Sequence, residues 1–355
     1  MMNNTKHIDF VIPWVDGNDP LWLKEKQKYQ ISNKMMNTDD HFKDWDNLQY
    51  LFRGIEEFAP WVNKIYFITY GHLPNWLNTQ HPKLVIVKHE DFLDKENLPV
   101  FNINAVEINL HRIKGLSEKF VFFNDDTFLT QPINPEVFFK NNLPVNVAIA
   151  DIMHEGVIAH IIVNNIDIIN RNFNRHKGEK LRKKERILKY FSKWFNIKYG
   201  FNMIKTLLLI NWPFTGFIDY HQPQPFLKQT FIDIWDKESE ILNQTSASKF
   251  RDSQNINQYL FKYWQFATGN FMPDSYKNAY KKRKYVNIRI KEHAITVAND
   301  IKSNKFQMYC VNDCTSKSRY TKEDMNKEDF EFCKKIIIEA FNTILPKKST
   351  FEVNE

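Results

Sequence analysis

Three polar residues, Asn124, Asp125 and Asp126, directly follow the apolar run 120–123 and form the part of the chain most suited to chemistry. Four consecutive apolar residues of high strand propensity predict a strand buried on both faces. Carboxylates at the carboxyl end of such a strand lie where open α/β sheets hold their ligands. Paired carboxylates there suit Mg²⁺ or Mn²⁺ on a diphosphate, since these hard cations prefer oxygen ligands. An ordinary turn that caps backbone groups would use the same residues, and this stretch alone leaves both readings open.

A second candidate is the segment Asp16-Gly17-Asn18-Asp19, which follows a strand-like apolar run at 8–15. Glycine lets the backbone approach a ligand closely, and the Asp and Asn side chains can bond ribose, sugar or base groups. A plain turn explains these residues equally well.

Glu107, His111 and Arg112 lie in a predicted helix that begins at Asn102 or Asn104. Residues four apart share one helix face, so an acid, a base and a cation could face a ligand together. Such residues more often form a solvated face or a buried polar pair, and that interpretation is favoured without other observations.

Two later residues are also candidates. His221 stands in a loop before a predicted helix at 226–242, where catalytic side chains are often held, although a core histidine would fit as well. Arg251 precedes a predicted helix at 253–266, whose amino end would favour anions. The pair Asn312-Asp313 again follows a strand-like run.

The elements that must position these residues alternate along the chain. Strands are predicted at 8–15, 64–69, 84–88 and 120–123. Helices are predicted from Asp44 or Asp46 to Phe58, at about 102–115 and at 324–345. Strands alternating with helices predict an α/β fold, with a mostly parallel sheet and covering helices.

Length and composition restrict the class of protein. The 355 residues, 43% hydrophobic, suffice for one large domain or two ordinary ones. We find no uncharged apolar run of about 18 residues and no signal-like start, so no spanning helix and no secretion are expected. Cys310, Cys314 and Cys333 lack the spacing of a zinc site, and we expect reduced thiols in a cytoplasmic protein.

The net charge of +7 comes from one segment of the chain. Eleven basic and two acidic residues lie between Arg171 and Lys198, so that this segment carries +9 and the remainder −2. No nucleic-acid partner is therefore expected. A solvated helix is the default interpretation of such a run. Aromatic residues among the lysines, Phe191, Trp194, Phe195 and Phe201, would also suit a helix lying on an anionic membrane surface.

Together these segments resemble the Stealth family of sugar-phosphate transferases, which includes bacterial capsule phosphotransferases and the eukaryotic GlcNAc-1-phosphotransferase. Four blocks carry the resemblance: 8–22, with Ile-Asp-Phe-Val-Ile-Pro-Trp-Val-Asp-Gly-Asn-Asp-Pro; 46–128, with Pro60-Trp61-Val62, His89-Glu90-Asp91 and Phe123-Asn124-Asp125-Asp126; His221 and Pro223 to Phe250-Arg251; and Cys310-Val311-Asn312-Asp313. They cover rather more than half of the chain. The sequence departs slightly at Lys249, where many members carry arginine, and 151–210 matches no block.

The resemblance implies transfer of a sugar 1-phosphate from a UDP-sugar (UDP-GlcNAc, UDP-GalNAc or a UDP-hexose) to a hydroxyl of a glycan acceptor. The product would be a phosphodiester in capsular or cell-surface polysaccharide, with UMP released. The acceptor could be lipid-linked, which would bring the enzyme to the inner face of the membrane. The implied core is Rossmann-like and similar to glycosyltransferase-A folds. Residues 1–150 would bind the nucleotide-sugar, 151–210 would be a basic, helical insertion or lid, and 211–355 would complete the catalytic core.

The resemblance also assigns roles to residues. Asp125 and Asp126 would hold Mg²⁺ or Mn²⁺, and His221, Arg251 and Asp125 would be catalytic. The expected substrate-binding residues are Asp16, Gly17, Asn18, Asp19, Arg53, Asn104, Glu107, His111, Arg112, Asn312 and Asp313.

Physical chemistry agrees with these roles, because phosphoryl transfer depends on positioning and charge neutralisation. Arginine's planar fork suits phosphate oxygens, and a histidine can take a hydroxyl proton near neutral pH. His221 could act as this base or as a nucleophile that forms a phosphohistidine. Two other functions remain open: a metal-dependent glycosyltransferase that releases UDP, and a polyanion-binding or membrane-bound interaction protein built on the basic run.

Overall fold

The central sheet of the computed structural model has five strands in the order β10-β4-β1-β2-β3. Their bounds are β1 Ile8–Pro13, β2 Ile65–Thr69, β3 Leu84–Lys88, β4 Lys119–Phe122 and β10 Gln224–Leu227. Strands β1, β2, β3 and β4 pair in parallel. In this sheet β10 alone runs antiparallel to its neighbour, β4. The predicted α/β fold with a mostly parallel sheet is confirmed. The structure describes residues 7–29, 44–153, 156, 158–173, 183–219, 221–316 and 323–353.

The apolar runs form strands because both faces of this sheet are covered. Every residue of β2 and β4 is buried, so these strands cannot alternate between apolar and polar side chains. Val11 of β1 pairs in register with Phe122 of β4, and both strands therefore end at the same edge of the sheet. The segments that follow them, 14–19 and 123–126, leave the sheet side by side.

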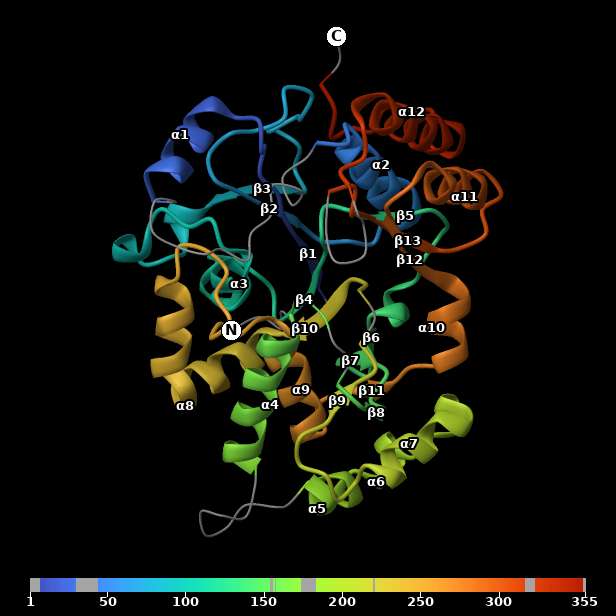
Figure 1. The fold of residues 1–355 in the computed structure, drawn as a ribbon. Coiled ribbons are helices and arrows are strands. Elements are labelled where there is room, and N and C mark those ends of the chain that lie inside the picture. The colour runs from blue at the N-terminus through green and yellow to red at the C-terminus, as the bar shows by residue number, and fades with distance from the viewer. Residues whose placement is uncertain are drawn as a thin grey trace.

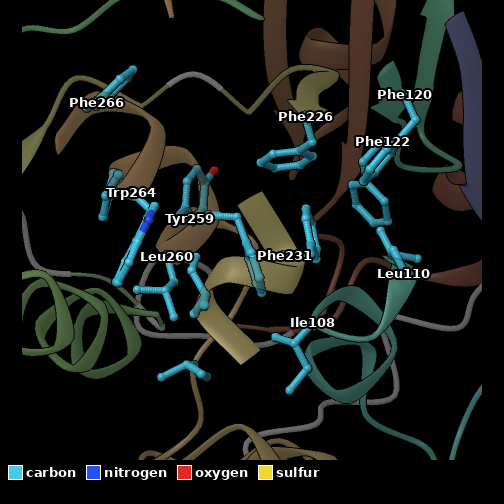
Figure 2. Packing of buried hydrophobic residues seen from close by; sticks show 14 of the residues in the cluster. Ile108, Leu110, Phe120, Phe122, Phe226, Phe231, Tyr259, Leu260, Trp264 and Phe266 are labelled. Atoms are coloured by element: carbon cyan, nitrogen blue, oxygen red, sulfur yellow. The ribbon is translucent and has the colours of Figure 1, made fainter. Parts of the chain in front are cut away.

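Helices lie on both faces of the sheet (Figure 1). One face packs against α3 (Ile103–Glu107), α8 (Lys228–Ala247) and α9 (Tyr259–Thr268), and the other against α2 (Leu48–Phe58), α11 (Lys291–Lys302) and α12 (Lys327–Ile344). On the first face the Phe120 ring lies 5.5 Å from that of Phe231, which in turn stacks on Phe261 at 3.7 Å. Figure 2 shows this aromatic packing between the sheet and α9.

A second sheet brings the carboxyl-terminal third of the chain to the end of β4. Its order is β12 (Arg283–Ile288), β13 (Met308–Asp313) and β5 (Thr127–Leu129). Cys310 of β13 pairs with Thr127 of β5, directly beside the acidic cluster. Two smaller sheets consist of β6 (Phe139–Lys140), β7 (Leu143–Asn146) and β11 (Met272–Pro273), and of β8 (Ala150–Asp151) and β9 (Gly216–Phe217). The remaining helices are α1 (Pro20–Tyr29), α4 (Ala159–Phe173), α5 (Lys183–Lys189), α6 (Phe191–Trp194), α7 (Met203–Leu208) and α10 (Tyr276–Lys282).

The middle segment, 151–210, is largely helical where it is described, and its buried apolar side chains join the core cluster of α8 and α9. The prediction of a solvated basic helix is wrong for Lys183 and Arg186, which are buried. Lys183 donates to the carbonyls of Leu209 and Trp212 at 3.0 and 2.9 Å, and burial lowers its pKa to about 7. Trp194 is also buried, so it is not part of an exposed aromatic face. Arg175, Lys177, Lys180 and Arg182 lie outside the described residues.

Three predicted helix boundaries are wrong. Phe226 belongs to strand β10, and the helix starts only at Lys228. The helix expected from residue 253 begins at Tyr259, so Arg251 is not at its amino end. The helix capped by Asn102 ends at Glu107 and is followed by a short 3-10 turn. Among the described helices, none is both long and apolar enough to cross a membrane.

Candidate functional site

The acidic cluster forms a tight turn between β4 and β5. The Thr127 amide donates to the Asn124 carbonyl at 3.2 Å, and the Val311 amide of β13 donates to the Asp126 carbonyl at 2.9 Å. Backbone hydrogen bonds from both sheets thus hold Asn124, Asp125 and Asp126 at the carboxyl end of β4, as the sequence predicts.

His221 lies against this turn. Its Nε2 is 2.8 Å from the Asn124 side-chain nitrogen and 4.0 Å from Asp126 Oδ2. Because the amide nitrogen can only donate, Nε2 accepts this hydrogen bond with its single lone pair and Nδ1 carries the proton. Nε2 can take a proton from a hydroxyl when that hydroxyl replaces the Asn124 donor. A carboxylate at this distance would stabilise the imidazolium that forms when Nε2 accepts a proton. The pair thus has the geometry of a general base and its counter-ion.

Two networks hold the histidine in this position. Asp219, two residues earlier, accepts from Lys262 Nζ at 2.7 Å and from the Tyr263 hydroxyl, which anchors the loop to α9. On the other side the His221 ring packs on Tyr285 with ring centroids 5.1 Å apart.

The predicted pair Asn312-Asp313 lies behind this aromatic contact. Asn312 donates to Asn287 Oδ1 at 2.7 Å and to the Tyr285 hydroxyl at 3.2 Å. Its neighbour Asp313 accepts from Trp45 Nε1 at 3.1 Å and from the Thr315 amide at 2.8 Å. Asn312 therefore holds the Tyr285 ring on which His221 packs. Asp313 instead bonds to Trp45 and Thr315 in the surrounding loops.

Asp125 reaches the protein surface. Desolvation by the surrounding turn, together with the nearby carboxylates of Asp126 and Asp44, raises the pKa of Asp125 to about 7. These carboxylates repel one another when all are ionised, and a bound cation would relieve that repulsion. Asp44, which the sequence suggested only as a helix start, is thus a third acid near the cluster.

The donor atoms here fit a divalent cation. One ligand atom each from Asp126, His221 and Cys310 lie within 4.8 Å of one another. Burial raises the pKa of the Cys310 thiol well above its usual value in the metal-free protein. The Asp126 carboxylate supplies a hard oxygen donor, which suits an ion such as Mg²⁺ or Mn²⁺. The identity of the ion is an expectation from the residue types.

The segment Asp16–Asp19 is ordered mainly by its own polar groups. Asp16 accepts from the Asn18 amide at 2.8 Å, and Asp19 caps α1 by accepting from the Trp22 amide at 2.7 Å. The Asp16 amide donates to His72 Nε2 at 2.7 Å. His72, which the sequence did not suggest, follows β2 at the same sheet edge and fixes this segment beside β4.

Arg251 and Glu107 form the next part of the site. Glu107 is 5% exposed and accepts from the Gln258 amide and side chain at 3.1 and 3.2 Å. Burial raises its pKa to about 7 although the positive charge of Arg251 opposes the change. Burial also lowers the pKa of Arg251, which Glu107 partly restores. The two side chains are therefore within electrostatic range, and the buried Asn104 lies on the same helix.

The chain around Arg251 is anchored by its neighbour Phe250. Phe250 stacks on Phe101 at 5.3 Å in a cluster with Trp22, against which Val15 packs. Burial raises the pKa of Tyr259 well above the usual value, and Asp219, Glu107, Tyr285 and Cys310 act on it electrostatically. Tyr259 is therefore within electrostatic range of Glu107 and of Asp219, which anchors the His221 loop.

Glu107→Gln should flatten the pH dependence of stability. With an ordinary pKa of 4.5 and a folded-state pKa of about 7, folding favours the protonated carboxyl. The protonated Glu107 carboxyl makes its full contribution to the free energy of unfolding below pH 4.5. That contribution is lost as the pH rises through 7, by up to about 1.4 kcal/mol per pH unit. Urea denaturation across this range should show a smaller decline for Glu107→Gln than for wild type or the exposed control Glu57→Gln. Equal declines would mean that Glu107 ionises normally.

His111 and Arg112 have different neighbours from Glu107, because the α-helix ends at Glu107. The His111 ring lies 5.7 Å from Trp235 of α8, and burial lowers its pKa to about 4. Arg112 pairs with Asp94 at 2.7 Å and covers Trp235 at 4.4 Å. The expected single face of acid, base and cation does not form.

Arg53 of α2 is also fully engaged. It binds both carboxylate oxygens of Glu352 at 2.8 and 2.7 Å and donates to the Leu345 carbonyl at 3.0 Å. The two side chains are only 10% and 4% exposed. This ion pair fastens the end of the chain to α2 and favours a structural role.

Arg53→Ala should lower the free energy of unfolding by about 3 kcal/mol, because it leaves the Glu352 carboxylate buried without a counter-ion. Chemical denaturation measures this loss, and kcat and KM of the folded variant should match wild type. The double variant Arg53→Met/Glu352→Leu should recover much of the stability, since no buried charge remains. A raised KM in folded Arg53→Ala would instead indicate substrate binding.

Comparison with known proteins identifies related sequences along the whole chain. Two family models match, the Stealth protein conserved region 1 over residues 6–34 and conserved region 2 over residues 41–146. Capsular polysaccharide phosphotransferase WcwK of Streptococcus pneumoniae is 40% identical over 357 residues, covering 99% of both chains. Receptor polysaccharide phosphotransferase WefC of Streptococcus oralis is 38% identical, covering 98% of this chain and 99% of that protein.

Similarity to solved structures is much weaker. A galactosyltransferase LgtC in complex with donor and acceptor sugar analogues shares 8% identity, with a TM-score of 0.39 and 96% of both chains covered. Mouse xyloside xylosyltransferase 1 also shares 8% identity, with a TM-score of 0.37, covering 86% of this chain and 97% of that chain.

End-to-end matches at this identity place the chain among the phosphotransferases, and the histidine beside clustered carboxylates suits that class. The chain belongs to the Stealth family.

Proposed function

We propose that the protein transfers a sugar 1-phosphate from a UDP-sugar to a hydroxyl of a glycan acceptor, forms a phosphodiester and releases UMP. The observation that carries this proposal is the position of His221 Nε2, 4.0 Å from Asp126 at the strand end where the Asp16–Asp19 segment also lies. The polysaccharide named for each relative supports a glycan acceptor. A lipid-linked acceptor would bring the enzyme to the cytoplasmic face of the membrane.

Each group has a distinct task in this reaction. Nε2 of His221 takes the proton of the acceptor hydroxyl as its oxygen attacks the phosphorus that carries the sugar. The bond from that phosphorus to the bridging oxygen breaks, and UMP leaves with this oxygen. Arg251 would bind the phosphate oxygens, with Glu107 as its buried partner. A divalent cation held by Asp125 and Asp126 would neutralise the diphosphate.

His221 could instead attack the phosphorus itself and form a phosphohistidine, which the acceptor then cleaves. Trapping the enzyme with labelled donor in the absence of acceptor distinguishes the two routes. An acid-labile, alkali-stable label on His221 would support the nucleophile, and an unlabelled enzyme that turns over normally would support the base.

The nucleotide product tests the proposed reaction. Purified protein is incubated with a panel of UDP-sugars and an acceptor glycan, and the nucleotide and the phosphorus spectrum of the product are recorded. UMP with a phosphodiester resonance is the expected result. UDP with an unphosphorylated glycosidic product would overturn the proposal in favour of glycosyl transfer.

A further inference from the structure

Exposed apolar side chains gather on the helical segment 188–214. We call them the apolar edge: Leu188, Phe191, Ile197, Phe201, Ile204, Leu207, Leu208, Trp212 and Phe214. Ile197 and Phe201 are each 89% exposed, Leu208 is 71% and Trp212 is 65%. Single exposed apolar residues are common on soluble proteins. A contiguous group marks a surface that a membrane or another molecule covers.

The members of the apolar edge lie close together. The 3-10 turn 197–202 continues directly into α7, and Lys183 at the start of α5 bonds to the carbonyls of Leu209 and Trp212 after α7. Figure 1 shows α5, α6 and α7 following one another along one border of the molecule, on the side away from α11 and α12. The exposed side chains therefore form one border rather than scattered points.

This border carries a net positive charge, although Lys205 pairs with Asp151 at 3.0 Å. Residues 183–214 contain seven basic residues and one acidic residue, Glu185. Lys184, Lys189, Lys198 and Lys205 are exposed among the apolar side chains. Aromatic and aliphatic groups beside lysines suit the boundary of an anionic bilayer, where the apolar groups enter the interface and the ammonium groups meet phosphates.

We propose that the apolar edge docks the protein on the surface of an anionic lipid bilayer. A second copy of the chain fits this border poorly, because a symmetric contact would bring two net-positive surfaces together. The proposed reaction supplies a reason for docking if its acceptor is lipid-linked. Vesicle binding requires no turnover, however, so its failure would leave the catalytic proposal intact.

Co-sedimentation of the full chain with vesicles tests the docking. We expect binding to phosphatidylglycerol vesicles and little binding to pure phosphatidylcholine. Replacing Ile197, Phe201 and Leu208 by serine should weaken binding at least about tenfold, because three inserted side chains are lost. The matched control replaces three exposed apolar residues of the opposite border, Ile290, Ile295 and Phe332, and should bind as wild type.

The charged component has its own test. Replacing Lys184 and Lys189 by glutamine should weaken binding about fivefold per lysine, and added salt should weaken wild-type binding. Circular dichroism and light scattering of each variant check folding and oligomeric state. Absence of wild-type binding, or equal binding by the serine variant and its control, would overturn the proposal. A dimer that the serine substitutions dissociate, without vesicle binding, would assign the edge to self-association instead.

Discussion

His221→Asn should reduce kcat by about 10² to 10⁴, the usual contribution of a positioned general base. KM for the UDP-sugar should change little, because the imidazole contacts Asn124 and Tyr285 rather than the Asp16–Asp19 segment. Its side chain is 39% exposed, so the fold should tolerate the change. Initial rates by UMP release measure the effect.

His160, exposed on α4, provides the matched control, and His160→Asn should keep wild-type rates and stability. Thermal unfolding of both variants separates a chemical defect from a folding defect. Near wild-type turnover in His221→Asn would exclude both the base and the nucleophile.

Asp125→Asn should abolish most activity and change how the protein binds Mn²⁺. In the wild type a proton must leave Asp125 before both carboxylates can bind the cation, and its pKa is about 7. The apparent affinity for Mn²⁺ should therefore increase about tenfold for each unit by which the pH is raised up to pH 7. Above pH 7 the affinity should be constant. Calorimetric titration of metal-free protein measures this dependence.

In Asp125→Asn the affinity should be weak and nearly independent of pH in this range, with kcat/KM lowered by at least about 10². Asp167→Asn, an exposed carboxylate of α4, is the control and should bind as wild type. Full activity of the wild type in excess chelator, or a pH-independent affinity, would contradict a cation at Asp125 and Asp126.

The sequence predicts the central part of the fold well because burial on both faces leaves a clear pattern. The runs at 8–13, 65–69, 84–88 and 119–122 are strands, and the acidic cluster lies at the predicted strand end. The sequence predicts a helix at Phe226, because a short edge strand that contains Pro225 shows no periodicity of its own. Only its pairing with β4 makes it a strand.

The site was less accessible to sequence reasoning because its contacts join distant segments. The residues around His72 and Tyr259 show no pattern that would mark either of them as part of the site. His72 nevertheless orders the Asp16–Asp19 segment, and Tyr259 is within electrostatic range of Glu107 and Cys310. The rule that ligands bind at the carboxyl ends of parallel strands could have identified His72, which follows β2. Lys183 looked solvated because charge in sequence does not reveal the carbonyls that a fold brings to it.

Strand β13 forms one wall of a site whose proposed reactive groups, Asp125, His221 and Arg251, lie before residue 252. During translation, Asp125, His221 and Arg251 leave the ribosome well before Cys310 and Asn312. A nascent chain therefore has its reactive groups without the Asn312 side chain that bonds Tyr285, and Tyr285 is the ring on which His221 packs. Catalysis should begin only after the chain has been synthesised beyond Asn312, so fragments that end before this residue should be inactive.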